Sequence, residues 1–221
     1  DWRKVQPGDA FVAVLDERAD GHDYAHRAVK RGAVAVIVDR PLPIFAVPVY
    51  HVDDTRVALG ELCHALMDDP SRRLRVIGVV GTQGKSTVVA LLESIYVAAG
   101  HDVGVLSSLK TYDGMSRGPG IEHDLSPAAL AARLASMEAA GCSHALLEIS
   151  SQALAQGKLA GVELDTVCGT LIDSARLDLH HTTKNYRDAQ RRVFEYLSPA
   201  GVAILNADDP LVAAMRARTR A

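Results

Sequence analysis

From about residue 74 onward, short apolar runs alternate with longer segments in which apolar residues recur every three or four positions. The short runs predict strands, and the longer segments predict amphipathic helices. Several of the expected strands are apolar at every position, as in a mostly parallel sheet that helices cover on both faces. The expected strands are residues 75–80, 103–106, 144–149, 164–172 and 201–205, and the expected helices are 85–99, 127–140, 185–197 and 209–218.

The first seventy residues show the same alternation in shorter elements. A charged stretch that contains Pro70, residues 68–73, interrupts the last helix and offers a linker. We therefore expect a small N-terminal α/β domain at residues 1–70 and a larger α/β domain at residues 71–221. The elements expected in the small domain are strands at 10–15, 33–38 and 47–52 and helices at 23–31 and 55–67.

Local signals mark some of the boundaries in the larger domain. Ser126 followed by Pro127 is typical of an N-cap and a first helical residue, and Gly141 is placed to end the same helix. Residues 111–124 hold four glycines or prolines and few apolar side chains, which predicts a loop or short hairpin over the site.

The most informative segment joins the first strand of the larger domain to its first helix. Its seven residues, called the phosphate loop below, are Gly81, Thr82, Gln83, Gly84, Lys85, Ser86 and Thr87. Glycines let the backbone wrap closely around phosphate oxygens, and the N–H groups at a helix start point at them. Lys85 adds a positive charge, and the hydroxyl of Ser86 or Thr87 can reach Mg²⁺. The segment predicts a site for ATP or GTP.

An alternative interpretation is a glycine-rich turn that contains a lysine by chance. The usual pattern has a glycine where this chain has Val79, so the match is incomplete. We favour the phosphate-binding interpretation because a strand, a glycine turn, Lys-Ser-Thr and an amphipathic run ending at Gly100 follow one another in the required order.

Polar residues that follow other strands are further candidates, because ligands of parallel α/β sheets bind at the carboxyl ends of strands. Glu148 is followed by the hydroxyls of Ser150 and Ser151, and its carboxylate could hold Mg²⁺ directly or through water. The alternative is a glutamate that caps the next helix.

Two later polar groups leave their role open. Residues 173–181 contain two adjacent histidines and aspartates, which fit either a metal or phosphate site or a solvated loop. After the last strand, Asn206 and Asp209 could hydrogen-bond a base or ribose, although an Asp-Pro pair is also ordinary helix capping.

Composition excludes several classes of function. The chain has 221 residues, 48% of them apolar, and a net charge of −3, with its basic residues concentrated only in the last few positions. Nucleic acid is therefore not an expected partner. The three cysteines are far apart, which favours buried thiols over a disulfide or metal site. With no leader and no membrane-length apolar run, we expect a cytoplasmic protein that does not bind membranes.

Taken together, the motifs resemble the Mur ligase family, and within it the muramoyl-tripeptide synthetases. The resemblance covers nearly the whole chain, through residues 1–13, 20–24, 81–87, 148–151 and 206–210. It implies a UDP-substrate-binding N-terminal domain and an ATP-binding central domain, without the family's third, C-terminal ligase domain. It also implies a monomer that acts on a UDP-muramoyl-peptide and an amino acid.

In this family, ATP phosphorylates a carboxylate of the muramoyl peptide, and an amine then attacks the acyl phosphate to form an amide. The resemblance therefore implies ATP and Mg²⁺ as cofactors, with Lys85 and Glu148 as catalytic residues. Ser86 and Glu148 would bind the metal. The remaining implied roles are nucleotide binding by residues 81–87, Asn206 and Asp209, and substrate binding by Ser126, Ser150, Ser151 and Lys158.

Several positions depart from the family pattern. Ala175 and Arg176 occupy the positions of an Asp-His pair, and a guanidinium cannot ligate Mg²⁺. Gln190 occupies the position of a carbamylated lysine, Gln152 that of a histidine, and Trp2 that of a serine which contacts the uracil nucleotide. The alternative hypothesis is thus a catalytically silent family member that binds nucleotide or serves as a scaffold. An unrelated phosphate-loop kinase or GTPase would leave the first seventy residues unexplained.

Overall fold

The computed structural model describes residues 1–15, 19–43, 46–121, 125–173 and 182–218. It contains two compact units, Asp1–Leu62 and Cys63–Ala221. The division falls inside helix α2 (Thr55–Ala65), whereas the sequence suggested a boundary at residues 70 and 71. Helix α2 does end before Pro70, and Asp68 and Asp69 both adopt positive φ angles there.

The first unit is built on a three-stranded parallel sheet with the order β1-β2-β3. Apart from Phe11, its core is formed by small and β-branched side chains, among them Val36 and Val38 of β2, which pack with Ala25 and Ala28 of α1. The strands are shorter than the sequence suggested. The bounds are β1 (Ala10–Val12), β2 (Ala35–Val38), β3 (Val49–His51), α1 (Ala25–Lys30) and the 3₁₀ helices η1 (Trp2–Lys4) and η2 (Gly21–Tyr24).

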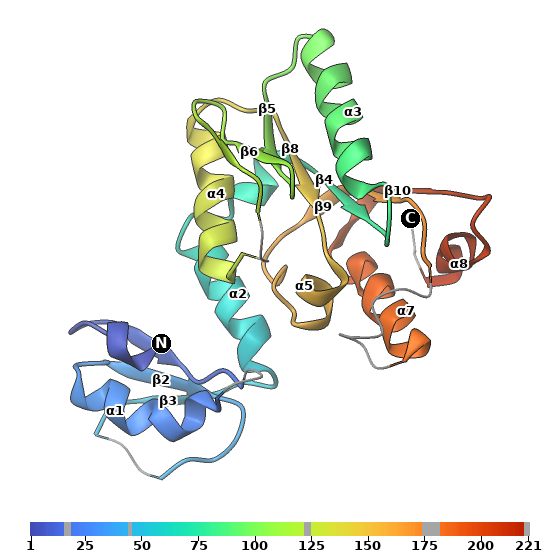
Figure 1. Ribbon diagram of the computed structural model, residues 1–221. Helices are drawn as coiled ribbons and strands as arrows, with labels where there is room; N and C mark the ends of the chain where they lie inside the picture. The colour runs from blue at the N-terminus through green and yellow to red at the C-terminus, as the bar shows by residue number, and fades with distance from the viewer. Residues whose placement is uncertain (16–18, 44–45, 122–124, 174–181, 219–221) are drawn as a thin grey trace. The chain divides into compact units, whose positions relative to one another are not determined.

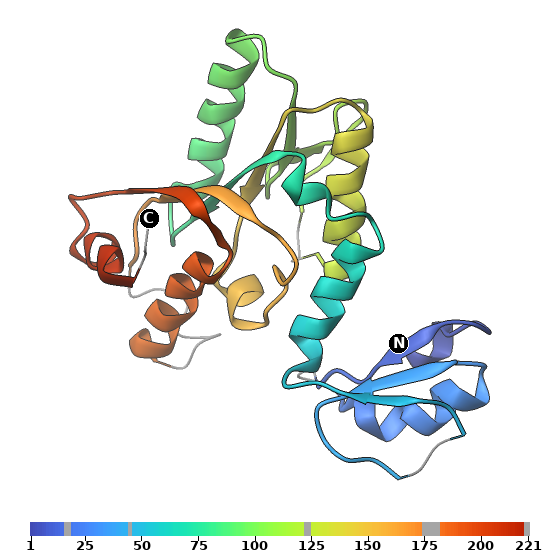
Figure 2. The same cartoon turned by 180° about the vertical axis from the view of Figure 1, so that it is seen from behind.

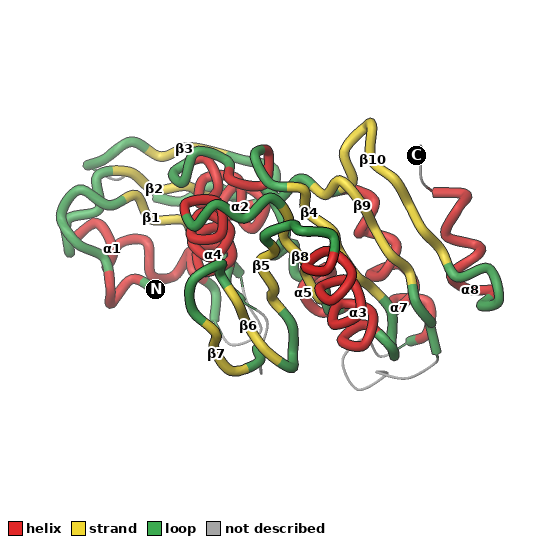
Figure 3. The backbone as a smooth tube through the Cα atoms, turned by 90° about the horizontal axis from the view of Figure 1, so that it is seen from above, coloured by secondary structure: helices red, strands yellow, loops and turns green. Residues whose placement is uncertain are grey.

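The second unit contains a seven-stranded sheet with the order β10-β9-β4-β8-β5-β6-β7. Figure 3 shows these strands side by side in this order. The first five are parallel, and β6 and β7 form an antiparallel hairpin at one edge. The bounds are β4 (Arg75–Val80), β5 (Val103–Leu106), β6 (Lys110–Tyr112), β7 (Arg117–Pro119), β8 (His144–Glu148), β9 (Leu164–Gly169) and β10 (Leu197–Leu205).

Helices cover both faces of this sheet, as predicted (Figures 1 and 2). Helix α3 packs on one face, and α4, α5, α7 and α8 pack on the other. The helices of this unit have the bounds α3 (Lys85–Ala98), α4 (Pro127–Ala139), α5 (Ser151–Ala155), α7 (Thr183–Arg191) and α8 (Pro210–Ala213), and the 3₁₀ helices are η3 (Pro70–Arg72), η4 (Arg192–Glu195) and η5 (Ala214–Arg218).

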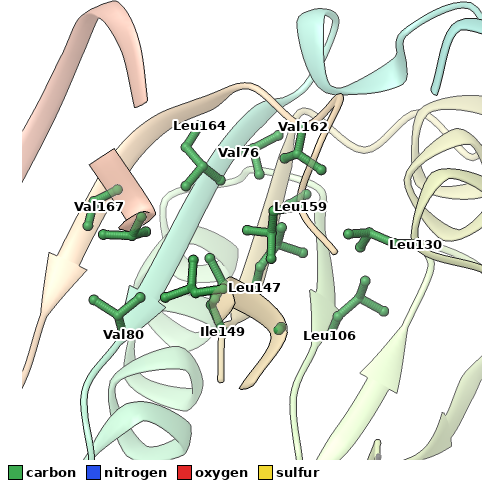
Figure 4. Packing of buried hydrophobic residues seen from close by; sticks show 14 of the residues in the cluster. Val76, Val80, Leu106, Leu130, Leu147, Ile149, Leu159, Val162, Leu164 and Val167 are labelled. Atoms are coloured by element: carbon green, nitrogen blue, oxygen red, sulfur yellow. The ribbon is translucent and has the colours of Figure 1, made fainter. Parts of the chain in front are cut away.

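The all-apolar strands are explained by this double cover. In β4, Val76 and Val80 belong to the core beneath α4, α5, α7 and α8, whereas Ile77 and Val79 pack against α3. Successive side chains of a strand point to opposite faces, so a strand covered on both sides is apolar throughout. Figure 4 shows the larger core, where Val80 and Val76 lie near Leu147 and Leu164 of neighbouring strands.

Most expected elements are present, with some differences. Ser126 caps α4, Pro127 is its first residue, and Gly141 adopts the positive φ expected after a helix end. The region expected to be a loop or short hairpin contains β6 and β7. Helix α5 was not predicted, because its five residues are too few to show a helical period. None of the helices in the described ranges is both long and apolar enough to cross a bilayer.

Candidate functional site

The phosphate loop leaves the carboxyl end of β4 and enters α3. Its backbone is held by the segment that follows the neighbouring strand β9. The amide of Thr82 donates to the carbonyl of Leu171 at 2.6 Å. The hydroxyl of Thr170 lies 2.6 Å from the carbonyl oxygen of Gln83 and 3.1 Å from that of Val80. The first half of the loop is therefore held by the two residues that follow β9.

Two glycines make this path possible. Gly81 has a φ of +138°, and a Cβ atom added there would lie 2.2 Å from Thr170 Oγ1 and 2.9 Å from the carbonyl oxygen of Leu171. Gly84 has a φ of +81° and is the N-cap residue of α3. Residues that carry a Cβ atom disfavour both conformations, which explains why glycine occupies these two positions of the loop.

Helix α3 begins at Lys85 with no side chain capping its first turn. Uncapped N–H groups and the positive end of the helix dipole together attract an anion. The ammonium group of Lys85 lies 3.3 Å from the carbonyl oxygen of Thr82, so its charge lies over the loop. Thr87 is exposed within the first turn of the helix. The loop can thus bind phosphate through backbone amides and one lysine.

A carboxylate from the adjacent strand meets this helix start. Ser86 Oγ lies 3.0 Å from Glu148 Oε1, at the end of β8. The second oxygen of Glu148 accepts hydrogen bonds from the amide of Ser108 at 2.9 Å and from its hydroxyl at 3.0 Å. The hydroxyls of Ser86 and Ser108 are themselves 3.0 Å apart. Ser108 was not singled out from the sequence, although it follows the strand at 103–106 and could have been found by that criterion.

These oxygens fit Mg²⁺ better than a transition metal. Among the residues that the structure describes, no group of three His, Cys, Asp or Glu side chains could hold a metal. Mg²⁺ is usually held by one or two protein ligands together with waters and substrate phosphates. One carboxylate and one serine hydroxyl beside a phosphate loop are such a set.

On the other side of the loop, Thr82 meets helix α7. Its hydroxyl lies 2.5 Å from the hydroxyl of Tyr186 and accepts a hydrogen bond from the amide of Asp173 at 3.0 Å. The amide nitrogen of Gln190 donates to Tyr186 Oη at 3.0 Å. Tyr186 and Gln190 are buried, at 1% and 0% exposure. Gln190, noted from the sequence as a departure from the family, is therefore joined to the loop through Tyr186.

Asn206 and Asp209 lie close to the loop but bond to the protein itself. Asn206 donates to the carbonyl of Thr170 at 2.9 Å and accepts from the amide of Asp208 at 3.0 Å. Asp209 caps α8 and also accepts from the amide of Ile172 at 2.7 Å. Burial alone would raise the pKa of Asp209, but these backbone donors outweigh it and hold the pKa below its usual value. Both residues support the segment that holds the loop.

The four substrate-binding candidates occupy helix starts and a turn. The hydroxyls of Ser126 and Ser150 accept from backbone amides as N-caps of α4 and α5. Ser151 is buried at the start of α5, and Lys158 follows that helix with a half-buried side chain. Among the residues that the structure describes, no hydrogen bond or ion pair joins Ser126 or Lys158 to the phosphate loop.

The polar cluster at 173–181 lies largely outside the described residues, and with it the departures Ala175 and Arg176. The cysteines match the expectation of unpaired thiols. All three are free, with Cys142 buried and Cys63 and Cys168 half-buried. Burial raises the pKa of each thiol.

The fold and this loop define an α/β protein with a glycine-rich loop suited to phosphate and a carboxylate beside the first turn of the helix that follows the loop. Comparison with known families is more specific. A model described as the Mur ligase middle domain matches residues 79–221, and one described as the Mur ligase family catalytic domain matches residues 1–66. The chain belongs to the Mur ligase family.

Its curated relatives include UDP-N-acetylmuramoyl-L-alanyl-D-glutamate–2,6-diaminopimelate ligases. That of Geobacillus thermodenitrificans is 36% identical, with 96% of this chain and 44% of the relative covered. That of Parabacteroides distasonis is 34% identical, with 100% and 46% covered. The chain thus spans somewhat less than half the length of these relatives.

Solved structures agree with this assignment. A UDP-N-acetylmuramoyl-L-alanyl-D-glutamate–2,6-diaminopimelate ligase superposes with a TM-score of 0.82 and 26% identity, over 99% of this chain and 44% of that one. The MurF ligase of Thermotoga maritima, solved with ADP, has a TM-score of 0.61 and 20% identity over 99% of this chain and 48% of its own. The second likeness shows the fold alone.

Proposed function

We propose that this chain carries the ATP-binding part of a ligase that adds an amino acid to a UDP-N-acetylmuramoyl peptide in peptidoglycan biosynthesis, in the cytoplasm. The observation that carries the proposal is the contact between Ser86 and Glu148 beside an uncapped helix start. The names of the relatives, which are ligases for 2,6-diaminopimelate, support the choice of substrate class.

The proposed chemistry explains the residue types at the loop. A carboxylate and the terminal phosphate of ATP repel each other, so bringing them together requires positive charge and fixed positions. Lys85 and the amides at the start of α3 would bind the phosphate oxygens. Ser86 and Glu148 would hold Mg²⁺, which supplies further charge between the phosphates.

We propose the remaining roles by the same reasoning. Residues 1–70 would bind the UDP portion of the substrate and residues 71–221 the nucleotide, with Ser126, Ser150, Ser151 and Lys158 on the substrate side. The hydroxyls of Ser126 and Ser150 also accept backbone amides as the N-caps of their helices.

One observation favours the alternative of a family member that binds nucleotide without ligating. Gln190 is a neutral, buried amide, so it supplies no negative charge to a second metal ion. ATP binding by the natural protein, without phosphate release for UDP-muramoyl-dipeptide and any amino acid offered, would support that alternative.

Calorimetry on the 221-residue chain tests nucleotide binding, with ATP or ADP titrated in the presence and absence of Mg²⁺. Lys85→Met should weaken ATP binding by about tenfold or more, since a charged hydrogen bond contributes roughly 1.5–3 kcal/mol. Glu148→Gln should remove most of the effect of Mg²⁺ on affinity. Lys30→Met, at an exposed lysine of α1, is the charge-matched control. No binding of either nucleotide at millimolar concentration would refute the proposal.

A further inference from the structure

The turn between β5 and β6 brings Ser108 to the carboxylate of Glu148. The amide of Ser108 donates to Glu148 Oε2 at 2.9 Å, and its hydroxyl donates to the same oxygen at 3.0 Å. The other oxygen, Oε1, accepts from Ser86 Oγ at 3.0 Å. The direction of this carboxylate relative to the phosphate loop therefore depends on where the turn lies.

Lys110, the first residue of β6, holds the turn through its backbone. Its carbonyl oxygen accepts from the amide and from the hydroxyl of Ser107, both at 3.1 Å. Its amide lies 3.2 Å from Ser107 Oγ, and Ser107 is buried. Ser108 thus lies between two residues that are bonded to each other, and a displacement of Lys110 also displaces Ser108.

The hairpin that carries Lys110 has a short contact with the rest of the sheet. The register joins β6 to β5 through two residue pairs, Val105 with Tyr112 and Leu106 with Thr111. On its other side, β6 pairs with β7 at the edge of the sheet. A two-stranded hairpin has little stability of its own, so a side-chain contact with the rest of the unit strongly affects where the turn lies.

Glu93 of α3 provides such a contact. Lys110 Nζ lies 2.5 Å from Glu93 Oε2, and the Glu93 side chain is 11% exposed. An ion pair with a buried partner adds little stability over apolar side chains of similar size, because taking the charges out of water is costly. What the pair does provide is direction, since it favours one position of the hairpin relative to the helix.

Glu93 lies on the same face of α3 as a residue of the phosphate loop. It follows Ser86 by seven residues, roughly two turns of the helix. Ser86 Oγ lies 3.0 Å from Ser108 Oγ. One face of α3 therefore contacts the turn at two points, directly at Ser108 and, further along the helix, through Lys110.

We propose that Glu93 and Lys110 are positioning residues, whose ion pair fixes the turn so that Ser108 holds the Glu148 carboxylate toward Mg²⁺ beside the phosphate loop. The inference rests on the proposed function, because it requires a metal ion between Glu148 and the nucleotide. Groups that orient a metal-binding side chain affect metal binding without touching the metal. Glu93 and Lys110 act in this way, through Ser108.

Hydrogen exchange of the Ser108 amide, followed by NMR on the chain without nucleotide or metal, tests the positioning. Lys110→Met keeps an unbranched side chain and removes the charge, so the amide should exchange about tenfold faster than in the wild type. Lys110→Arg keeps the charge and should exchange at close to the wild-type rate. An unchanged rate in Lys110→Met would overturn the proposal.

Calorimetry with ATP, in the presence and absence of Mg²⁺, measures the consequence for the metal. In Lys110→Met, the ratio of the Kd without Mg²⁺ to the Kd with Mg²⁺ should fall by about three- to tenfold. The Kd of metal-free ATP should stay unchanged, because the phosphate loop itself is intact. Glu93→Met should give the same fall, and the double variant no larger one, because both residues act through one ion pair.

Stability measurements separate positioning from a merely structural role. The double variant Glu93→Met/Lys110→Met leaves no unpaired charge, so its urea midpoint should stay close to that of the wild type. Its response to Mg²⁺ should nevertheless fall. Glu138→Met is the matched control, because it removes an ion pair with Arg73 on α4, which packs on the sheet face opposite α3. It should leave Ser108 exchange and the Mg²⁺ response unchanged.

The remaining outcomes also decide the matter. If a single variant does not fold, which circular dichroism would show, the double variant takes its place. Wild-type exchange at Ser108 and a wild-type Mg²⁺ response in the double variant would overturn the positioning role while leaving nucleotide binding intact. Fold-changes that multiply in the double variant, or an equal loss in Glu138→Met, would also overturn it. Absence of ATP binding by the wild-type chain would refute the proposed function, and with it the role toward Mg²⁺.

Discussion

Replacing Gly81 by alanine tests whether the phosphate loop is held by β9 as the geometry indicates. The new Cβ atom would lie 2.2 Å from Thr170 Oγ1 and 2.9 Å from the carbonyl oxygen of Leu171. Thr170 must then move, and its hydroxyl gives up the hydrogen bond that its single proton makes toward the carbonyl oxygens of Gln83 and Val80. The substitution thus acts on the backbone of the loop and not on a group that touches the ligand.

The expected cost has two parts. The hydrogen bond lost by the single proton of the Thr170 hydroxyl amounts to about 1 kcal/mol. Placing alanine at a φ of +138° adds strain of about 1–3 kcal/mol. The free energy of unfolding of the second unit should therefore fall by roughly 2–4 kcal/mol, which lowers the Tm by about 10 °C for a domain of this size.

Urea denaturation followed by circular dichroism measures this change, and calorimetry with Mg-ATP measures its effect on binding. Gly100→Ala is the matched control, because Gly100 also has a positive φ, of +82°, but no atom lies within 4 Å of its added Cβ. Its cost should be the strain alone, about 1–2 kcal/mol, with unchanged ATP affinity. Thr170→Val removes the hydroxyl without adding a Cβ and isolates the hydrogen-bond part.

The reasoning would be refuted if Gly81→Ala and Gly100→Ala had equal free energies of unfolding. It would also be refuted if Gly81→Ala bound ATP as tightly as the wild type, because a displaced Gln83 carbonyl must alter the loop.

Three further predictions concern ionisable groups. Asp209→Asn should lower the free energy of unfolding by about 1 kcal/mol at neutral pH, because one hydrogen-bond acceptor is lost. The pKa of Asp209 in the folded protein lies below its usual value of 3.8. The stability difference between wild type and variant should therefore disappear as the pH falls through that lowered pKa. Burial lowers the pKa of His64, with Asp69 opposing in part, so wild-type stability should fall as pH drops below about 6.5. Urea titrations at several pH values should show a flatter profile for His64→Leu, and an unchanged slope would contradict the assignment. Because burial raises the pKa of all three thiols, iodoacetamide should label the folded chain more slowly than the urea-unfolded chain by mass spectrometry, and equal rates would argue against it.

The elements that could be predicted from sequence are those whose signals are local. The turn from β4 into α3 could be predicted because its signals lie in consecutive residues. The start of α4 could be predicted because Ser126 and Pro127 are a typical N-cap and first helical residue. The apolar strands also indicated a sheet covered on both faces before any strand was paired. Short elements such as α5 escaped prediction because five residues show no reliable period.

The sequence by itself determined the strand, glycine turn and helix start of the phosphate loop, but the tertiary structure decided which side chains surround it. Strand β4 lies between β8 and β9, and this order brings Glu148 to one side of the loop and Thr170 to the other. Ser108, which contacts Glu148, and Tyr186, which contacts Thr82, belong to segments outside the loop that follow it in the sequence. Strand order depends on long-range packing of the two core faces, which no local pattern encodes, so these neighbours became visible only once the sheet was assembled.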